Sequence, residues 1–398
     1  MTHLQLFVVL SLPITGLCYA TLGSIKLPLA KRLELDEARV GGLISAFGFM
    51  VGPIILLCGA LSDAFGRKPV WMVGSLLVVL SFVIFAWARR YPMALLATVL
   101  LAAGWTAMIN VANPVMAGAF ADPFTGSNIG DALFGGGAFL CPILVSVLHK
   151  YLGFEKGIGV IALLAILPFV LAFGLELGGG ELEGDLAKAF EGFGQLLTDK
   201  TIWLLGLTLM CWVVIESGTA GWASTLVKES APAGETVETS DRIAAGALSA
   251  FWLCFMGARL LTVYLIQGAD MPNAELVRIT QIVQLSIAAA AVLTMLALVA
   301  TRRRPLVIAL IVLAGFICGP FFPNLIGQLF THLGASQQME YAGRSVGMIF
   351  ACASVGWTLL PTAMGFMGRR YGIRRAFLLP ACAGGLMAAL IMANKIAP

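Results

Sequence analysis

Long apolar runs separated by short polar connections constrain this chain most strongly. We count twelve runs, each close to the roughly 20 residues that an α-helix needs to cross a bilayer. Hydrophobic residues make up 59% of the 398 residues and charged residues 12%, about half the charged fraction of soluble domains. The sequence therefore predicts an all-α membrane protein with twelve transmembrane helices. The runs cover approximately residues 5–28, 38–60, 69–88, 93–121, 126–150, 156–177, 200–227, 242–267, 274–300, 305–331, 342–367 and 373–393.

Several other function classes lack their sequence signals. The formal net charge is only +4, and no dense basic run indicates a nucleic-acid partner. The eight cysteines are scattered singly through apolar runs, without the spacing of a metal site or a disulfide framework. Neither an H-E-x-x-H metal motif nor a G-x-x-x-x-G-K-[ST] phosphate loop occurs. We therefore expect no metal, no cofactor and no enzymatic activity.

A longer gap divides the runs into two groups of six. Within this gap Leu186, Phe190, Phe193 and Leu197 recur at helical spacing, which predicts a short helix lying on the membrane surface. A tether of this kind suits two bundles that rock against each other. The predicted domains are an N-terminal six-helix bundle, a cytoplasmic linker with the interfacial helix and a C-terminal six-helix bundle, at residues 1–177, 178–199 and 200–398.

An internal repeat supports two pseudo-symmetric halves. Residues 42–47 in the second run read G-L-I-S-A-F, and residues 246–251 in the eighth run read G-A-L-S-A-F. A glycine, a proline five residues later and another glycine recur around the fifth and eleventh runs, at Gly137, Pro142 and Gly153, and at Gly356, Pro361 and Gly372. Chance alignment of short Gly/Ala-rich pieces is the alternative for either match alone. Both matches relate a helix to the sixth helix after it, which favours a repeat.

The connection between the second and third runs carries a distinctive motif. Residues 59–68 read G-A-L-S-D-A-F-G-R-K. Asp63 can pair with Arg67 one helical turn on. The spacing G-x-L-x-D-x-x-G-R-K resembles the loop signature of the major facilitator superfamily of transporters. The resemblance implies the two-bundle major facilitator fold, transport by alternating access and a cytoplasmic position for this loop.

The same loop predicts a conformational gate. We expect Asp63 and Arg67 to clamp the cytoplasmic ends of the bundles together. Asp122, just past the fourth run, is a candidate additional partner. The alternative is an ordinary charged loop that ends two helices.

The charges disagree with the signature about orientation. The signature places this loop and both termini in the cytoplasm, with the protein in the cell (inner) membrane. In that orientation most basic residues would lie on the non-cytoplasmic side. The positive-inside rule therefore favours the opposite orientation. We follow the signature, since it is a specific loop and the charge rule is a statistical bias. Basic residues on the opposite side include Arg302, Arg303, Arg304, Arg369, Arg370, Arg374 and Arg375.

Acidic residues inside apolar runs are candidates for proton coupling, because charge within a bilayer is costly. Glu216 lies near the middle of the seventh run. A structural carboxyl bonded to a neighbouring helix is the alternative. Asp131, early in the fifth run, is the second candidate, although an acid there can also simply favour the helix dipole. Arg259 and Arg344 are the matching basic residues.

Amides and aromatic rings complete the predicted site. Asn110 and Asn113 precede Pro114, and Asn324 and Gln328 follow Pro323. Amides beside a proline can bind freed backbone carbonyls or the hydroxyls of a ligand. The rings of Trp212 and Trp222 offer apolar faces, although most tryptophans in such proteins serve packing. The predicted solute-binding residues are Asn110, Asn113, Glu216, Trp212, Trp222, Asn324 and Gln328.

Several stretches resemble the fucose–proton symporter branch of the superfamily. In the fifth helix they are Asn128, Phe134-Gly135-x-Gly137 and Pro142, and in later helices Glu216-x-Gly218-x3-Trp222, Phe251-Trp252-x5-Ala258-Arg259 and Gly319-Pro320-x2-Pro323. Two positions depart from that branch, with Ala258 in place of glycine and Asp131 in place of a frequent histidine. The drug-antiporter signature is not met, since Ile143-Leu144 follows Cys141-Pro142.

These features together predict a secondary active transporter for a small polar solute, such as a sugar, coupled to protons. The expected partners are this solute, protons and the lipid bilayer, and the expected state is a monomer. The alternatives are an exporter or uniporter of an amphipathic compound, and a transporter-like sensor without flux.

Overall fold

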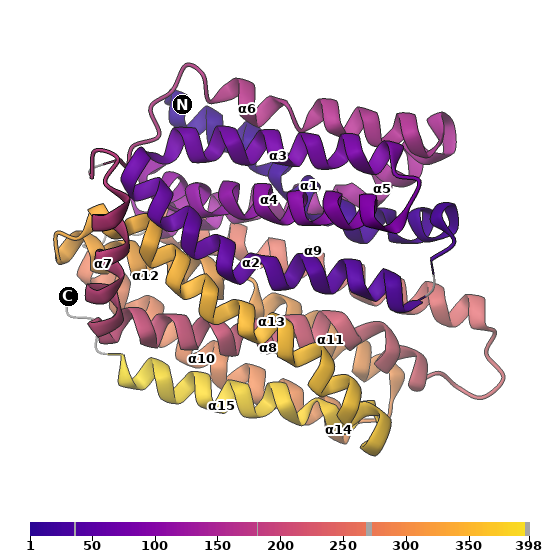
Figure 1. The fold of residues 1–398 in the computed structure, drawn as a ribbon. Coiled ribbons are helices and arrows are strands. Elements are labelled where there is room, and N and C mark those ends of the chain that lie inside the picture. Colours follow the sequence, from indigo (N-terminus) through magenta and orange to yellow (C-terminus); the bar gives the residue numbers. More distant parts are fainter. Residues whose placement is uncertain (36, 181, 268–272, 395–398) are drawn as a thin grey trace. The chain divides into compact units, whose positions relative to one another are not determined.

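The chain is helical throughout the part that the structure describes. This computed structural model describes residues 1–35, 37–180, 182–267 and 273–394, and these ranges contain helices but no β-strand (Figure 1). The predicted all-α class is therefore confirmed. Contacts group the residues into two compact units: Met1–Thr198 with Leu333–Ala351, and Asp199–His332 with Cys352–Pro398.

The first unit contains the first seven helices and the beginning of a later one. They are α1 (His3–Leu33), α2 (Glu37–Phe65), α3 (Arg67–Trp87), α4 (Tyr91–Ala119), α5 (Pro123–Leu164), α6 (Leu167–Leu171), α7 (Leu186–Thr198), the 3-10 helix η1 (Met339–Tyr341) and the start of α13 (Ala342–Tyr371).

The second unit contains the remainder of α13 and the other helices. They are α8 (Lys200–Glu229), α9 (Val237–Gln267), α10 (Asn273–Ala300), α11 (Arg304–Cys318), α12 (Phe321–Ala335), α14 (Ile373–Ala376) and α15 (Leu378–Ala393). Helix α12 ends within the first unit, since the boundary follows His332.

Eleven helical spans in the described residues are long and apolar enough to cross a membrane. One of them, Pro123–Leu171, is much longer than a bilayer requires, at 49 residues. It bends at Gly153, whose φ of 77° and ψ of 176° are not helical. Because this bend divides the span into two arms, the eleven spans accommodate the twelve predicted membrane helices.

The internal repeat is visible in backbone conformation and in packing. Gly153 ends the first arm of α5, and Gly372 (φ 87°) ends α13, so the two glycines matched in sequence make equivalent turns. Left-handed φ values of this kind favour glycine, which has no Cβ. Within the first unit α2 packs on α4, and within the second α9 packs on α11. The segments 42–47 and 246–251 lie on these corresponding helices α2 and α9.

The predicted short helix of the linker is present as α7. Its Ala189 packs against Ala60 of α2, with Phe193 beside them. Phe190 and Leu197 are exposed. Helix α7 therefore has one buried face and two exposed apolar side chains, and its position at a membrane surface remains a prediction.

Candidate functional site

Asp63 lies in a fully buried hydrogen-bonded cluster of the first unit. It is 1% exposed and belongs to the last turn of α2. The backbone N–H of Gly343 donates to its Oδ1 at 2.9 Å, and that of Arg344 donates to its Oδ2 at 3.0 Å. The Arg344 Nε donates to the same Oδ2 at 2.8 Å. The Asp63 carboxylate therefore accepts hydrogen bonds from free N–H groups in the first turn of α13 and also pairs with a guanidinium charge.

The guanidinium of Arg344 is also held from its other side. Its Nη1 donates to the Ala189 carbonyl of α7 at 3.0 Å, and its Cζ lies 4.4 Å from the centre of the Tyr341 ring. The hydroxyl of Tyr341 donates to Gln195 Oε1 at 2.8 Å. An ideal Cβ at Gly192 would lie only 1.8 Å from Arg344 Nη1. A side chain at position 192 would therefore have to displace the Arg344 guanidinium.

The structure assigns Asp63 a different partner from the one expected. We expected Arg67, but α2 ends at Phe65 and Gly66 (φ 92°) turns the chain before α3. The helical spacing that would bring Asp63 and Arg67 together is therefore interrupted. Arg67 is half-buried and donates from Nη1 to the Leu177 carbonyl at 3.3 Å, which ties α3 to the following linker.

Asp122, the candidate additional partner in the gate, has a local structural role. Its Oδ1 accepts a hydrogen bond from the Thr125 backbone N–H at 2.8 Å, and it is the N-cap of α5. This is the ordinary function of an aspartate before a helix. The suggested reach of Asp122 to Arg67 stays a prediction.

The amides of α4 divide between two uses. Asn110 accepts from Ser62 Oγ at 3.0 Å and donates to the Gly343 carbonyl at 3.0 Å, so it belongs to the Asp63 cluster. Asn113 donates to the Ile109 carbonyl at 2.7 Å. Its Oδ1 is buried and has no hydrogen-bond partner among the described residues. Asn113 thus keeps an acceptor that a solute hydroxyl could use.

Asp131 is buried within α5. The helix begins at Pro123, so Asp131 lies about two turns inside it. The helix dipole acts mainly on charges in the first turn, which weakens the purely structural interpretation of this acid.

A break between α11 and α12 organises the second unit. Pro323 has no N–H, so it cannot satisfy the carbonyl of Gly319 four residues earlier. Arg259 Nε of α9 donates to that carbonyl at 2.9 Å. Trp212 Nε1 of α8 donates to the neighbouring Cys318 carbonyl at 3.1 Å. Trp212, a predicted solute-binding residue, and Arg259 therefore cap the backbone at the break.

Close helix packing makes this arrangement possible. An ideal Cβ at Gly319 would lie 2.3 Å from the Phe255 carbonyl, so α9 and α11 approach backbone to backbone. The Trp212 ring stacks on Phe321 and Phe322, with centroids 6.2 and 5.8 Å apart. Trp212 is 5% exposed and consequently serves packing in this structure.

Glu216 lies one turn after Trp212 on α8 and is 9% exposed. Ser217 Oγ donates to its Oε2 at 2.8 Å. The charge of Arg259 on α9, which also donates to the Gly319 carbonyl at the helix break, acts favourably on the carboxylate form. The carboxyl, a basic side chain and the helix break therefore belong to one local cluster, which sequence spacing alone did not reveal.

The remaining predicted residues of the second unit have different surroundings. Gln328 Nε2 of α12 donates to Gln284 Oε1 of α10 at 3.0 Å, and Gln328 is therefore engaged between two helices. Asn324 is buried one turn before it on α12. Trp222 is half-buried, and an ideal Cβ at Gly365 of α13 would lie 3.6 Å from its ring.

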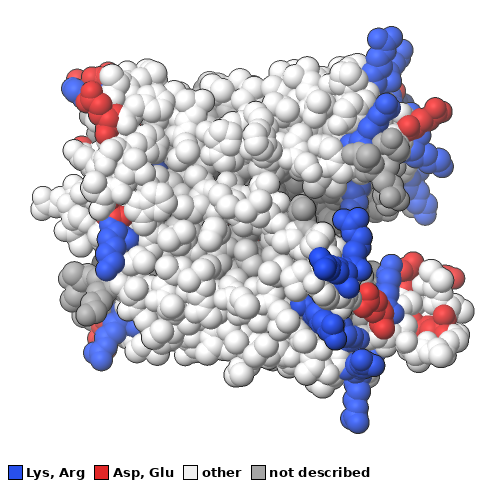
Figure 2. All heavy atoms as spheres, turned by 60° about the horizontal axis from the view of Figure 1, so that its bottom comes forward, with Lys and Arg blue, Asp and Glu red and all other residues white. Residues whose placement is uncertain are grey.

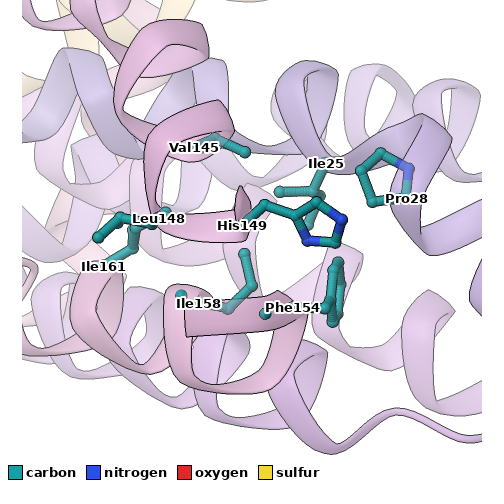
Figure 3. Close-up of a pocket in the computed structure, with 10 residues that line it drawn as sticks. Ile25, Pro28, Val145, Leu148, His149, Phe154, Ile158 and Ile161 are labelled. Carbon is teal, nitrogen blue, oxygen red and sulfur yellow. The ribbon is translucent and has the colours of Figure 1, made fainter. Parts of the chain in front are cut away.

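A small cavity lies elsewhere in the first unit, beside the bend of α5. Figure 3 shows the His149 ring among apolar side chains of α1 and α5, including Ile25, Val145 and Phe154. None of the predicted site residues lines it. Its apolar lining does not suit a polar solute.

Sequence reasoning missed the partners that hold these clusters together. Gly343 and Gly192 supply close approach, and Ser62 and Ser217 supply hydrogen bonds. Gly192 lies at the buried face of an amphipathic segment. A glycine at such a position was the available signal of close packing.

Comparisons with known proteins agree with this architecture. The sequence profile described as Major Facilitator Superfamily matches residues 8–343. A search of curated proteins finds no match. The structure is similar to the crystal structure of the Escherichia coli fucose:proton symporter FucP, with 17% identity, 100% of each chain covered and a TM-score of 0.78.

Two further solved structures are similar over nearly their whole length. The human organic anion transporter MFSD10 (TETRAN) has 16% identity, with 98% of this chain and 99% of that chain covered and a TM-score of 0.73. The proton:xylose symporter XylE has 14% identity, with 99% and 95% covered and a TM-score of 0.70. Identities this low show a shared fold.

Proposed function

This chain belongs to the Major Facilitator Superfamily, and we propose that it carries a small polar solute such as a sugar across the membrane together with protons. The superfamily consists of membrane transporters, so the protein is a multi-pass transporter and not an enzyme. The proposal adds the class of solute and the coupling ion. Similarity to a fucose:proton and a xylose:proton symporter supports it.

Glu216 is the observation that carries proton coupling. It is a buried carboxyl on a membrane-spanning helix, with a hydroxyl donor beside it and Arg259 within electrostatic reach. Loss of a proton creates a charge that this apolar surrounding disfavours, while Arg259 favours it. A carboxyl balanced in this way can take up a proton in one conformation and release it in another.

Each unit has its own candidate solute-binding residues. In the first unit, Asn113 Oδ1 is a buried acceptor without a hydrogen-bond partner among the described residues. In the second unit, Asn324 and Trp222 are the candidates that we keep. Asn110, Gln328 and Trp212 already bond or stack with neighbouring helices, so we assign them positioning roles. Asp131 is the second candidate for the proton.

We propose further that the cluster around Asp63 is the conformational gate. It joins α2 to the start of α13, and α13 continues into the second unit beyond Ala351. Arg67 and Asp122 then support the gate by fixing the ends of α3 and α5. The protein is proposed to act as a monomer in the cell (inner) membrane, with both termini cytoplasmic.

Transport in proteoliposomes tests the proposal. Purified protein is screened with L-fucose, D-xylose and D-glucose, with and without an imposed pH gradient. Glu216→Gln, which mimics the protonated acid, should retain solute exchange and lose accumulation driven by the gradient. Asp131→Asn, measured in parallel, tests the second candidate for the proton. Asp241→Asn, which changes an exposed acid, is the control and should still accumulate solute.

The possible results separate the alternatives. Equal accumulation by Glu216→Gln and the parent contradicts the role of Glu216. Exchange without gradient-driven accumulation in the parent indicates a uniporter. Absence of flux for every solute, in protein that binds one of them, indicates a sensor.

A further inference from the structure

Arginines gather at one end of the second unit. Two segments carry them: residues 301–304, where α10 is followed by α11, and residues 369–375, which span the end of α13, Gly372 and most of α14. Neither of these two connections contains an acidic residue. Figure 2 shows basic side chains grouped at the margins of a largely uncharged surface. We call the five exposed side chains the arginine patch: Arg302, Arg303, Arg369, Arg370 and Arg375.

Two less exposed arginines build the patch. Arg374 donates from Nη1 to the Thr301 carbonyl and from Nη2 to Ser230 Oγ, the latter at 2.5 Å, and so binds the two connections together. Arg304 pairs with Glu235. The five outer arginines therefore project from connections that are fixed to each other.

The inner layer has unused hydrogen-bonding capacity. Arg304 is 9% exposed, yet its Nε and Nη2 have no hydrogen-bond partner among the described residues. Buried guanidinium donors without acceptors are costly. None of the five patch arginines makes an ion pair within the described residues. Arg304 thus keeps free donors beside one carboxylate, Glu235, and the five outer arginines have no ion-pair partner among the described residues.

The patch lies where a membrane-spanning protein meets lipid headgroups. Helix α10 ends at Ala300 and α13 at Tyr371, immediately beside the two connections. Tyr371 is 48% exposed, and the Arg370 Cζ lies 5.4 Å from the centre of its ring. Tyrosine is enriched at the membrane–water interface, and guanidinium groups bind phosphate through paired hydrogen bonds. We propose that the arginine patch binds the phosphate groups of anionic phospholipids.

The proposal is independent of the solute and of proton coupling. Its test uses full-length protein in nanodiscs of phosphatidylcholine with phosphatidylglycerol. The phosphatidylglycerol that remains bound after mild detergent extraction is counted by mass spectrometry. The patch variant changes Arg302, Arg303, Arg369, Arg370 and Arg375 to Gln. The charge-matched control changes five exposed basic residues elsewhere to Gln, namely Lys26, Arg89, Arg90, Lys150 and Lys156.

We expect the patch variant to lose selective retention of phosphatidylglycerol, by roughly five-fold for each arginine that contacts a headgroup. The control should retain it. A third variant with lysine at the five patch positions keeps the charge and the fold, and should retain part of the binding, because lysine cannot bind phosphate in bidentate fashion.

Three results overturn the proposal. Equal retention by patch variant and parent shows that the patch does not bind lipid. Equal loss in the patch variant and the control shows a general effect of net charge. Displacement of phosphatidylglycerol by millimolar inorganic phosphate, with phosphate bound in its place, shows a site for free anions. Size-exclusion profiles of all variants verify folding.

Discussion

At the scale of single residues, a buried ion pair joins Asp63 at the end of α2 to Arg344 at the start of α13. Glu216 was recognisable because acids are rare in apolar runs, and Asp63 because it belongs to the loop signature. The partner of Asp63 was not, since Arg344 lies 281 residues away and no spacing rule connects them. The i, i+4 spacing within a helix suggested Arg67 as the partner. That spacing does not apply, because Gly66 adopts a positive φ and ends the helix between the two residues. The solute ligands remain predictions for the same reason, because contacts between distant helices decide which amides are free.

The Asp63–Arg344 pair should be strongly coupled. Asp63→Asn leaves a buried guanidinium uncompensated, and removing one partner of a buried pair typically costs about 3–5 kcal/mol. We expect slower transport and a lower melting temperature. Asp63→Asn combined with Arg344→Gln should cost clearly less than the sum of the single changes, measured by thermal unfolding in detergent.

A matched surface pair provides the control for this coupling. Asp241 pairs with Lys228 at 2.5 Å, and both side chains are about half exposed. Exposed pairs contribute only about 0–1 kcal/mol. Asp241→Asn should leave transport and melting unchanged. Additive costs for Asp63 and Arg344 contradict the proposed gate contact.

At the scale of elements, apolar length predicted the helices and glycine or proline predicted their interruptions. The run at 126–150 and the next one correspond to the two arms of the span Pro123–Leu171, which Gly153 separates. The run at 305–331 is divided into α11 and α12, because Gly319 and Pro320 lie between them. The side chains that cap such a break come from other helices, so sequence patterns within the segment could not identify them.

Helix α7 offers a prediction with an internal control. A Cβ at Gly192 would lie 1.8 Å from Arg344 Nη1, whereas a Cβ at Gly194 would meet nothing within 4 Å. Gly192→Ala should displace Arg344 or α7 and slow transport. Gly194→Ala, on the same helix, should be neutral or stabilise by about 0.5–1 kcal/mol, since alanine favours helix. Similar effects of both changes on transport and unfolding rule out a specific contact.

The break in the second unit predicts a coupled pair of substitutions. Pro323→Ala restores an N–H that can bond the Gly319 carbonyl, which Arg259 now satisfies. Arg259→Lys should lower stability by about 1–3 kcal/mol in the parent, because it removes a hydrogen bond from a charged donor. The same change should cost less in the Pro323→Ala background. Identical costs in the two backgrounds, measured by thermal unfolding, contradict the capping role.

At the scale of the whole molecule, the sequence patterns were enough to predict the fold but not to identify the solute. The major facilitator fold was predicted from the twelve apolar runs, the repeat that relates each helix to the sixth helix after it, and one loop signature. The superfamily profile and the solved structures confirm this fold. The repeat was detectable in the sequence because Gly153 and Gly372 both adopt a positive φ at equivalent turns of the two halves. Solute identity depends on a few side-chain atoms, and orientation depends on charges that conflict with the signature.

The last prediction concerns that orientation. Within the first unit the loop after α6 lies beside the signature, because the Arg67 N–H donates to the Gly178 carbonyl at 3.0 Å and the Gly184 N–H donates to the Ala64 carbonyl at 2.9 Å. Glu183 is exposed in this loop, and Arg89 is exposed at the far end of α3. The two positions are therefore on opposite sides of a bilayer that α3 crosses.

Cysteine labelling in intact cells distinguishes the two orientations. With the native exposed Cys382 replaced by serine, Glu183→Cys should react with a membrane-impermeant maleimide only after permeabilisation, and Arg89→Cys should react without it. The reverse result would place the termini outside the cytoplasm and show that the positive-inside rule prevails over the loop signature. The arginine patch would then face the cytoplasmic leaflet, where anionic lipids attract basic segments most strongly.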